Sequence, residues 1–161
     1  MWGIFSLSNM RIPHFDLTEA NELKASEKKL LSSLNNLLKA LNDKNLSTQS
    51  LTIINQEIDL IHKIIKDGKG LKVQILKSQN KILKQIEKEE NLVPKNHYQR
   101  LWLVLGMSAF GIPIGVLFGI ATGNMGLLGI GLVIGMPIGL IYGKHLDKKA
   151  AEENRQLDFS R

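Results

Sequence analysis

The chain has 161 residues, a net charge of +6 and no cysteine, which excludes a disulfide framework and thiolate metal sites. Its basic residues alternate with acidic ones, and no basic patch carries the interleaved aromatic residues that bind single-stranded nucleic acid. We therefore expect no nucleic-acid partner. The charge is unevenly distributed, because the 43 residues of 101–143 contain no Lys, Arg, Asp, Glu or His.

The first 15 residues form an apolar segment that carries a single arginine. Two interpretations remain open for it. In the first, the segment covers the helical module that follows or is partly disordered. In the second, it lies among lipid headgroups as an interfacial anchor. Its large apolar residues are Trp2, Ile4, Phe5, Leu7, Ile12 and Phe15.

Residues 16–92 predict a cytosolic module of three helices. The stretch Asp16-Leu-Thr-Glu19 is typical of a helix start. Leucine and isoleucine then recur at helical spacing, a polar break follows residue 41, and Asp67-Gly68-Lys69-Gly70 reads as a turn. We place the helices at about 17–42, 48–67 and 71–91 and expect Pro94 to end the third.

The apolar stripes of this module are wider than a coiled-coil seam, which favours a small antiparallel bundle or a multistranded coiled coil. Few aromatic residues are available to fill its core. A core this thin suggests that another surface completes it. We expect that surface to be a second copy of the chain, another helical protein or the membrane.

After a juxtamembrane linker at 93–100, residues 101–143 predict a transmembrane hairpin. Residues 101–122 and 127–143 are apolar enough to cross a bilayer, which needs about 17–25 residues per helix. Gly123-Asn124-Met125-Gly126 is the turn between them. The alternative is a buried helical pair in a soluble protein, but no soluble segment here is apolar enough to cover it. The predicted fold is thus all-α: a helical bundle or coiled-coil module followed by this hairpin.

Charged residues flank the hairpin on both sides and are missing from its turn. By the positive-inside rule, both termini, including the tail at 144–161, face the cytoplasm, and the turn faces outward. Aromatic residues at the helix ends favour the membrane interface. The predicted interface residues, which contact lipid headgroups, are Tyr98, Arg100, Trp102, Tyr142, Lys144, Lys148 and Lys149.

Each predicted membrane helix carries nearly the same nonapeptide, GIPIGVLFG at 111–119 and GMPIGLIYG at 135–143. Glycines four residues apart allow close approach of helix backbones in lipid. The two stripes either close the hairpin on itself or also build an oligomer, for which Gly106, Ala109, Gly126 and Gly129 offer a sparse second face. The predicted packing stripe consists of Gly111, Gly115, Gly119, Gly123, Gly131, Gly135, Gly139 and Gly143.

Pro113 and Pro137 hold matching places in the two copies. Each lacks a backbone N–H and is expected to kink its helix. Charged side chains inside the membrane usually mark ion or proton pathways, so their absence argues against a selective transporter. A wide pore lined by glycine backbone stays open as an alternative.

The GxPIGxxxG units, the Gly-Asn turn and the tail LDKKAAEENRQL at 146–157 resemble bacterial glycine-zipper membrane proteins. These are small, largely uncharacterised hairpins that end in a D-K-K-A-x-E-x-G-R-Q-L-like tail. Asn154 stands where such tails often have glycine, and both residues accept a left-handed helix cap. The resemblance covers roughly residues 101–157. It implies a bacterial inner-membrane location and no particular activity.

No arrangement of residues indicates an enzyme, a cofactor or a metal site. The four histidines, His14, His62, His97 and His145, lack metal-ligand spacing, and the DGKG at 67–70 lacks the P-loop pattern. Two hypotheses follow. The chain is a membrane-anchored interaction or assembly module that acts through its cytosolic helices, or it is an oligomeric membrane-perturbing or pore-forming effector of the toxin or defence type.

Overall fold

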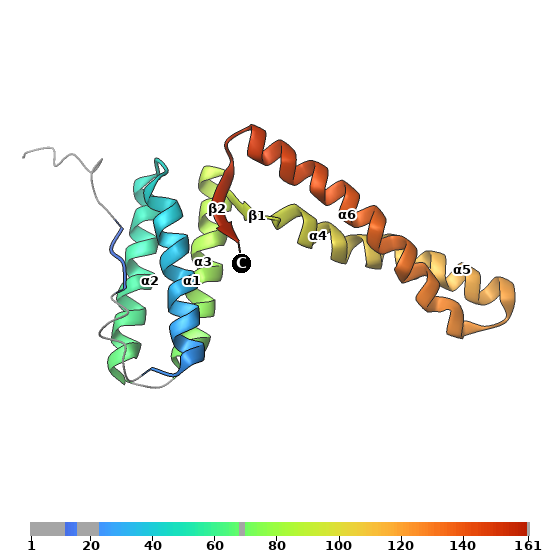
Figure 1. Ribbon diagram of the computed structural model, residues 1–161, viewed down its shortest axis with the longest axis horizontal. Coiled ribbons are helices and arrows are strands. Elements are labelled where there is room, and N and C mark those ends of the chain that lie inside the picture. The colour runs from blue at the N-terminus through green and yellow to red at the C-terminus, as the bar shows by residue number, and fades with distance from the viewer. Residues whose placement is uncertain (1–11, 16–22, 68–69, 161) are drawn as a thin grey trace, which may run out of the picture. The chain divides into compact units, whose positions relative to one another are not determined.

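A computed structural model describes residues 12–15, 23–67 and 70–160. The chain forms two units. The first contains the chain up to Val93 together with Leu157–Phe159, and the second contains Pro94–Gln156. The described residues are mostly helical, with three helices in the first unit and a hairpin of two long apolar helices in the second (Figure 1).

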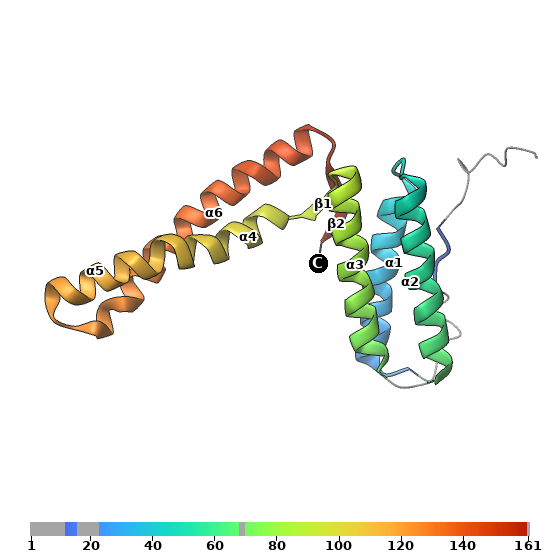
Figure 2. The same cartoon turned by 180° about the vertical axis from the view of Figure 1, so that it is seen from behind.

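The helical unit consists of α1 (Ala25–Asn42), α2 (Thr48–Asp67) and α3 (Leu71–Glu90). Helix α3 packs against both α1 and α2, and Figure 2 shows the three helices side by side from behind. The leucine and isoleucine stripes supply the core, as their spacing predicts. Its fully buried helical members are Leu31, Leu34, Leu37, Leu38, Leu41, Ile54, Ile61, Ile75, Ile82 and Ile86.

The ends of these helices have identifiable causes. Helix α1 begins at Ala25, after Lys24 in an extended conformation whose N–H donates to the Glu27 carboxylate (3.0 Å). The predicted start at 16–19 lies outside the described residues. Helix α3 is bounded by Gly70 and Asn91, both left-handed, which ends it just before Pro94.

A buried carboxylate joins α2 to α3. Glu57 is only 2% exposed, accepts a hydrogen bond from the Ser78 hydroxyl (2.6 Å) and forms an ion pair with Lys81 (2.6 Å). A buried charge is tolerated only when such partners satisfy it. This cluster therefore fixes one pairing of the two helices.

The all-α prediction is corrected by two short strands. Strand β1 (Val93–Lys95) lies in the predicted linker, β2 (Gln156–Ser160) lies in the predicted tail, and they form a two-stranded sheet. Alternation along β2 turns Leu157 and Phe159 inward and leaves Asp158 and Ser160 exposed. Both inward side chains join the core of the helical unit, so the chain's own tail helps to complete that thin core.

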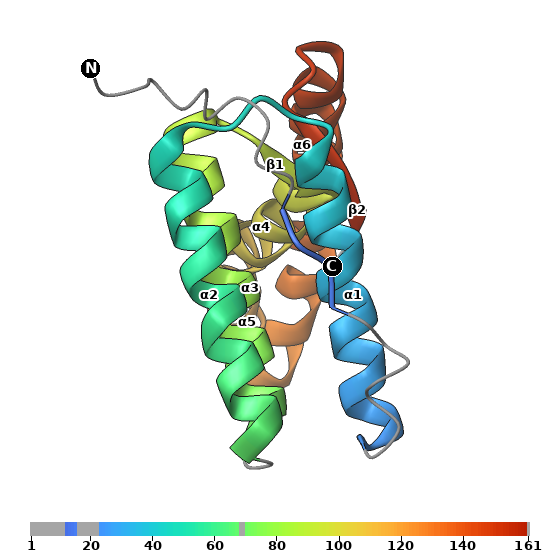
Figure 3. The same ribbon diagram turned by 90° about the vertical axis from the view of Figure 1, so that its left-hand side faces the viewer.

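The described part of the N-terminal segment also lies on the helical unit. Ile12 and Phe15 are 4% and 5% exposed and belong to the same core. Figure 3 shows the backbone of 12–15, in dark blue, running beside α1. For these residues, the covering interpretation of the segment is the one that holds. Residues 1–11 lie outside the described part of the chain.

The second unit is the apolar hairpin. Its first arm combines α4 (His97–Leu105), a π-helical turn (Gly106–Gly111) and α5 (Ile112–Thr122). After a 3₁₀ turn at Met125–Leu127, the second arm is α6 (Leu128–Glu152). The first arm begins earlier than the predicted residue 101, and α6 continues beyond Gly143 through the predicted start of the tail. Asn154 then adopts the left-handed conformation expected of it (φ 56°).

Glu90 makes the stability of the helical unit depend on pH. Its carboxylate accepts hydrogen bonds from the Ser47 N–H (2.8 Å) and the Ser50 hydroxyl (2.9 Å) at the start of α2. Burial by itself raises the pKa of Glu90, but the hydrogen bonds from Ser47 and Ser50 outweigh it and hold the pKa below the ordinary 4.5. Because the folded-state pKa is the lower one, this stabilisation is fully present above about pH 4.5 and is lost as pH falls through the folded value.

We expect Glu90→Gln to flatten the acid side of the unfolding free energy plotted against pH, since the variant lacks the proton-linked carboxylate. Urea unfolding at a series of pH values below 6 measures the slope. Glu89→Gln is the matched control, because Glu89 is exposed and makes only a surface ion pair with Lys88 (3.4 Å). Equal slopes for the two variants would contradict the assignment.

Candidate functional site

The contact between the two arms of the hairpin is built from glycine. Between residues 101 and 143 every buried residue is a glycine, while the large apolar side chains remain wholly or partly exposed. A Cβ added to Gly131, Gly135 or Gly139 would fall on backbone atoms of the opposite arm. The arms therefore touch backbone to backbone, which small residues alone permit. The buried glycines are Gly106, Gly111, Gly115, Gly119, Gly131, Gly135, Gly139 and Gly143.

The partners of these glycines follow an antiparallel register. Gly143 faces Tyr98 and Gln99, Gly139 faces Trp102 and Gly106, and Gly135 faces Gly106 and Gly111. Nearer the turn, Gly131 faces Gly111 and Gly115, Gly115 also faces Leu128, and Gly119 meets Met125. The two nonapeptides thus do not pack on each other copy to copy. Each packs mainly on residues outside the other copy.

Gly106 joins this contact because of the π-helical turn. Gly106 and Gly111 are five residues apart, so regular α-helical spacing places them on different faces. The wider turn at Gly106–Gly111 contains one more residue and brings both onto α6. Gly106, a candidate for the sparse second face, thus packs inside the hairpin: a Cβ at Gly106 would lie 2.5 Å from the Gly135 carbonyl oxygen of the same chain.

The two matching prolines have different surroundings. Pro113 lies in the first turn of α5, directly after the π-helical turn, where the widened backbone accommodates a ring that would otherwise press on the preceding turn. The Ser108 hydroxyl donates to the carbonyl of Val104 (2.9 Å) in this region. Pro137 instead lies inside α6, which continues through it. The predicted kinks at both prolines stay predictions.

Gly123 does not lie in the packing stripe, and this prediction is corrected. It ends α5 in the left-handed conformation (φ +65°), and nothing lies within 4 Å of the place a Cβ would take. The side chain of Asn124 accepts the N–H of Gly126 (2.9 Å) and closes the turn. A Cβ at Gly126 would meet only the Asn124 side chain of the turn (3.0 Å), and one at Gly129 would have open space, so neither glycine belongs to the contact between the arms.

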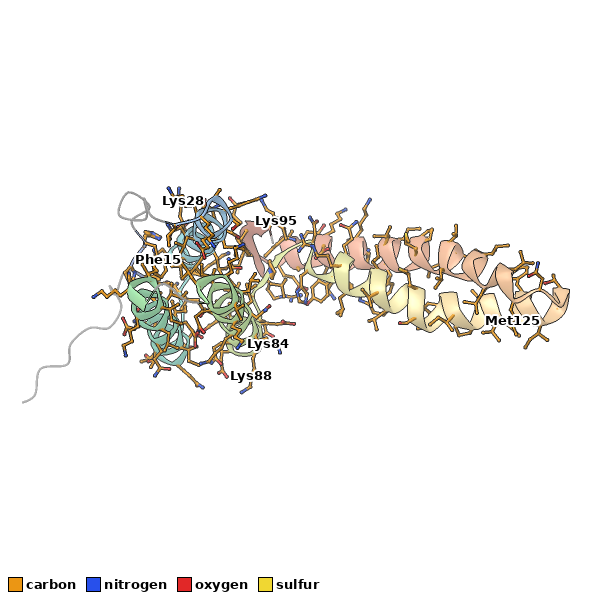
Figure 4. The ribbon with its side chains drawn as sticks, turned by 90° about the horizontal axis from the view of Figure 1, so that it is seen from below. Phe15, Lys28, Lys84, Lys88, Lys95 and Met125 are labelled. Carbon is orange, nitrogen blue, oxygen red and sulfur yellow. The ribbon has the colours of Figure 1, made fainter. Side chains whose placement is uncertain are left out.

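The outer surface of the hairpin is apolar. Residues 97–122 and 125–152 form helices long and apolar enough to cross a membrane, and only 22% and 17% of their most apolar windows are buried. Leu117, Ile120, Val133 and Ile141 are each at least 66% exposed. Figure 4 shows the side chains pointing away from both arms as far as Met125 at the tip. In a water-soluble protein the large apolar side chains mostly lie inside, so this distribution is the reverse.

The residues predicted at the membrane interface lie near the open end of the hairpin. Trp102 and Tyr142 contact each other across the two arms, with ring centroids 4.3 Å apart at 63°. Tyr98 is half-buried beside Gly143. Arg100, Lys144, Lys148 and Lys149 are exposed, and the last two pair with Glu152 (3.8 Å) and Glu153 (4.0 Å).

One residue of this region was not found by sequence reasoning. Asp147 continues the stripe of Gly139 and Gly143 by one further helical step and is only 7% exposed. Its carboxylate accepts the N–H groups of Tyr98 (3.1 Å) and Gln99 (2.9 Å), in the first turn of α4. An acid at a helix N-terminus satisfies unpaired donors and opposes the helix dipole. The sequence did contain one signal for this cap: Asp147 is the single acidic residue in the basic stretch 144–149.

We expect Asp147→Ala to destabilise the closed hairpin by about 1–3 kcal/mol, because two part-buried N–H groups lose their acceptor. Asp147→Asn keeps one acceptor oxygen and should cost less. Detergent-to-SDS unfolding followed by Trp102 fluorescence in a Trp2→Phe background reports the change. Lys148→Ala is the control, since its side chain is 78% exposed. An Asp147→Ala midpoint equal to that of the control would exclude the capping role.

A cluster of side chains that could hold a metal ion is not found in the part of the chain that the structure describes. Among those residues no three His, Asp or Glu side chains are placed to hold a metal ion. The site that the hairpin offers is a packing surface. Its chemistry consists of close backbone contact, one carboxylate cap and an apolar exterior.

Comparison with known proteins yields no match: no family model matches the chain, and neither a curated protein nor a solved structure does. The resemblance to bacterial glycine-zipper proteins is thus carried by the motifs alone.

Proposed function

We propose that this chain is an integral protein of the bacterial inner membrane, in which the hairpin anchors a helical module that binds a partner protein. The observation that carries the proposal is the inverted hairpin: glycines fill its interior and large apolar side chains cover its outside. Such a surface suits hydrocarbon and is unfavourable in water. Both termini face the cytoplasm in this proposal, because basic residues flank the hairpin and the turn is uncharged.

The glycine contacts favour an anchor over a pore. Each glycine that packs does so against the other arm of the same chain, and the lipid-facing surface is left with few small residues for contacts between hairpins. No charged side chain occurs in 101–143 to line a polar channel. The helical unit, with its mixed polar surface, is then the part that meets other proteins.

The anchor is tested by expression in a bacterial host. We expect the chain to stay in the membrane pellet after alkaline carbonate extraction, with the membrane potential unchanged. A reporter that works only outside the cytoplasm should be active when inserted at Asn124 and silent at either terminus. Recovery in the carbonate supernatant would overturn the anchor. Collapse of the membrane potential that Gly139→Leu abolishes would establish the pore-forming alternative instead.

A further inference from the structure

The segment Ile12–Phe15 is held on the helical unit as a bound peptide would be. Its Ile12 N–H donates to Asn42 Oδ1 (2.8 Å), and Asn42 Nδ2 donates back to the Ile12 carbonyl (3.2 Å). Asn35 makes the same pair of hydrogen bonds with Phe15, both at 2.9 Å. Each of these two asparagines thus satisfies both backbone groups of one residue, as a neighbouring strand does in a sheet.

The spacing of the two asparagines matches an extended ligand. Asn35 and Asn42 are two turns apart on one face of α1, a rise of about 10.5 Å. Three residues of polyproline-like chain rise about 9 Å, which brings Ile12 and Phe15 opposite the two amides. Because Ile12 precedes Pro13, its backbone is biased toward this extended conformation. The segment runs antiparallel to α1, since its earlier residue pairs with the later asparagine.

The side chains of the segment fall into two groups, one buried and one exposed. Ile12 and Phe15 are buried, and the Phe15 ring contacts His62 of α2 with centroids 4.6 Å apart. Pro13 and His14 are exposed, and His14 Nε2 reaches only the Asn42 amide (3.4 Å). The helical unit therefore buries two apolar side chains of the segment, and these are three residues apart. Asn42 and His62 at the rim are exposed, so a competing segment can reach them.

We propose that this surface, formed by Asn35, Asn42 and His62 over the apolar core between α1 and α2, is a peptide-binding site. Its ligand is an extended segment with the pattern apolar–Pro–x–apolar. Ile12–Phe15 occupies the site as an intramolecular ligand, and a partner's segment of the same chemistry binds by displacing it. Recognition through the backbone accommodates many sequences, while the high effective concentration of the tethered segment keeps the site closed to weak competitors.

This inference rests on the proposed function, in which the helical unit meets partner proteins, and it names the site of that meeting. Different experiments test the peptide site and the membrane anchor, so one proposal can be contradicted while the other stands. Peptide binding is measured in detergent and does not depend on membrane insertion, whereas carbonate extraction and the topology reporter do not depend on the peptide.

The test uses the full chain in mild detergent and the labelled peptide SNMRIPHFDLT, which corresponds to residues 8–18. Fluorescence anisotropy should show saturable binding to the Ile12→Ala/Phe15→Ala chain, whose own segment no longer competes, and at least ten-fold weaker binding to the wild-type chain. A peptide with alanine at both apolar positions should bind at least ten-fold more weakly. Adding Asn35→Ala to the chain should weaken binding similarly, whereas Asn36→Ala, on the exposed side of α1, should not.

Equal binding of the two peptides, or equal effects of Asn35→Ala and Asn36→Ala, would overturn the proposal and leave the segment as a fixed part of the core. A measurement without substitutions guards against a misfolded variant. In the wild-type chain, millimolar peptide should speed hydrogen exchange at the Ile12 and Phe15 amides at least ten-fold, because it displaces the tethered segment. Exchange rates that do not respond to peptide would overturn the proposal as well.

Discussion

Gly139→Ala is expected to open the hairpin, although alanine is the better helix former. The added Cβ would collide with the Trp102 carbonyl, approach its carbon to 2.8 Å and lie 3.1 Å from the Gly106 Cα. These atoms are backbone and cannot rotate away, so the arms must separate. Overpacking of this kind typically costs about 1–3 kcal/mol. The midpoint of SDS-induced unfolding should fall accordingly.

Trp102 lies in the contact between the arms and provides a fluorescence signal for their separation. Trp102 stacks edge-on against Tyr142 across the two arms, and the chain's one other tryptophan, Trp2, can be replaced by phenylalanine. Fluorescence of Trp102 in mixed micelles therefore follows the separation of the arms directly. The same preparation gives the oligomeric mass by light scattering.

Gly129→Ala is the matched control on the same helix. Nothing lies within 4 Å of the Cβ that it would add, so this variant should be neutral or more stable by up to about 1 kcal/mol from helix propensity. Gly106→Ala should behave like Gly139→Ala, because Gly106 packs inside the hairpin. Loss of an oligomer with an unchanged Trp102 signal would show instead that the glycines join separate chains.

Leu157→Ala should destabilise the helical unit by about 2–5 kcal/mol, as large-to-small changes at buried sites do. Leu157 is fully buried in the core formed by the three helices, although it lies at the far end of the chain from them. A loss of this size is a large share of the total stability of about 5–15 kcal/mol that a small domain has. Hydrogen exchange of α1 and α3 should rise together in the variant.

Leu76→Ala is the matched control for this prediction. It removes the same side chain from α3, but Leu76 is 41% exposed, so its loss should cost less. Equal exchange in α1 and α3 for the two variants would mean that β2 lies on the helical unit without supporting it.

The sequence by itself determined the helical content, the two long apolar helices and the position of the turn. These features depend on local composition: a 43-residue stretch without charge and leucine or isoleucine at helical spacing need no tertiary information. Glycine four residues apart likewise pointed to close helix packing, and its partners in the structure lie on the opposite arm.

Only the tertiary structure decided how these pieces meet. The π-helical turn shifts Gly106 by one residue into the packing face, and no periodicity that assumes regular helix geometry contains that shift. Leu157 and Phe159 alternate over too few residues to be told from loop, and they become strand because β1 pairs with them and the helical core buries them. Asp147 acts on an N-terminus far away in the sequence, and Asn35 and Asn42 look like ordinary surface positions until Ile12 and Phe15 lie on them. In each case the deciding contact joins residues distant along the chain, whereas a sequence pattern records only near neighbours.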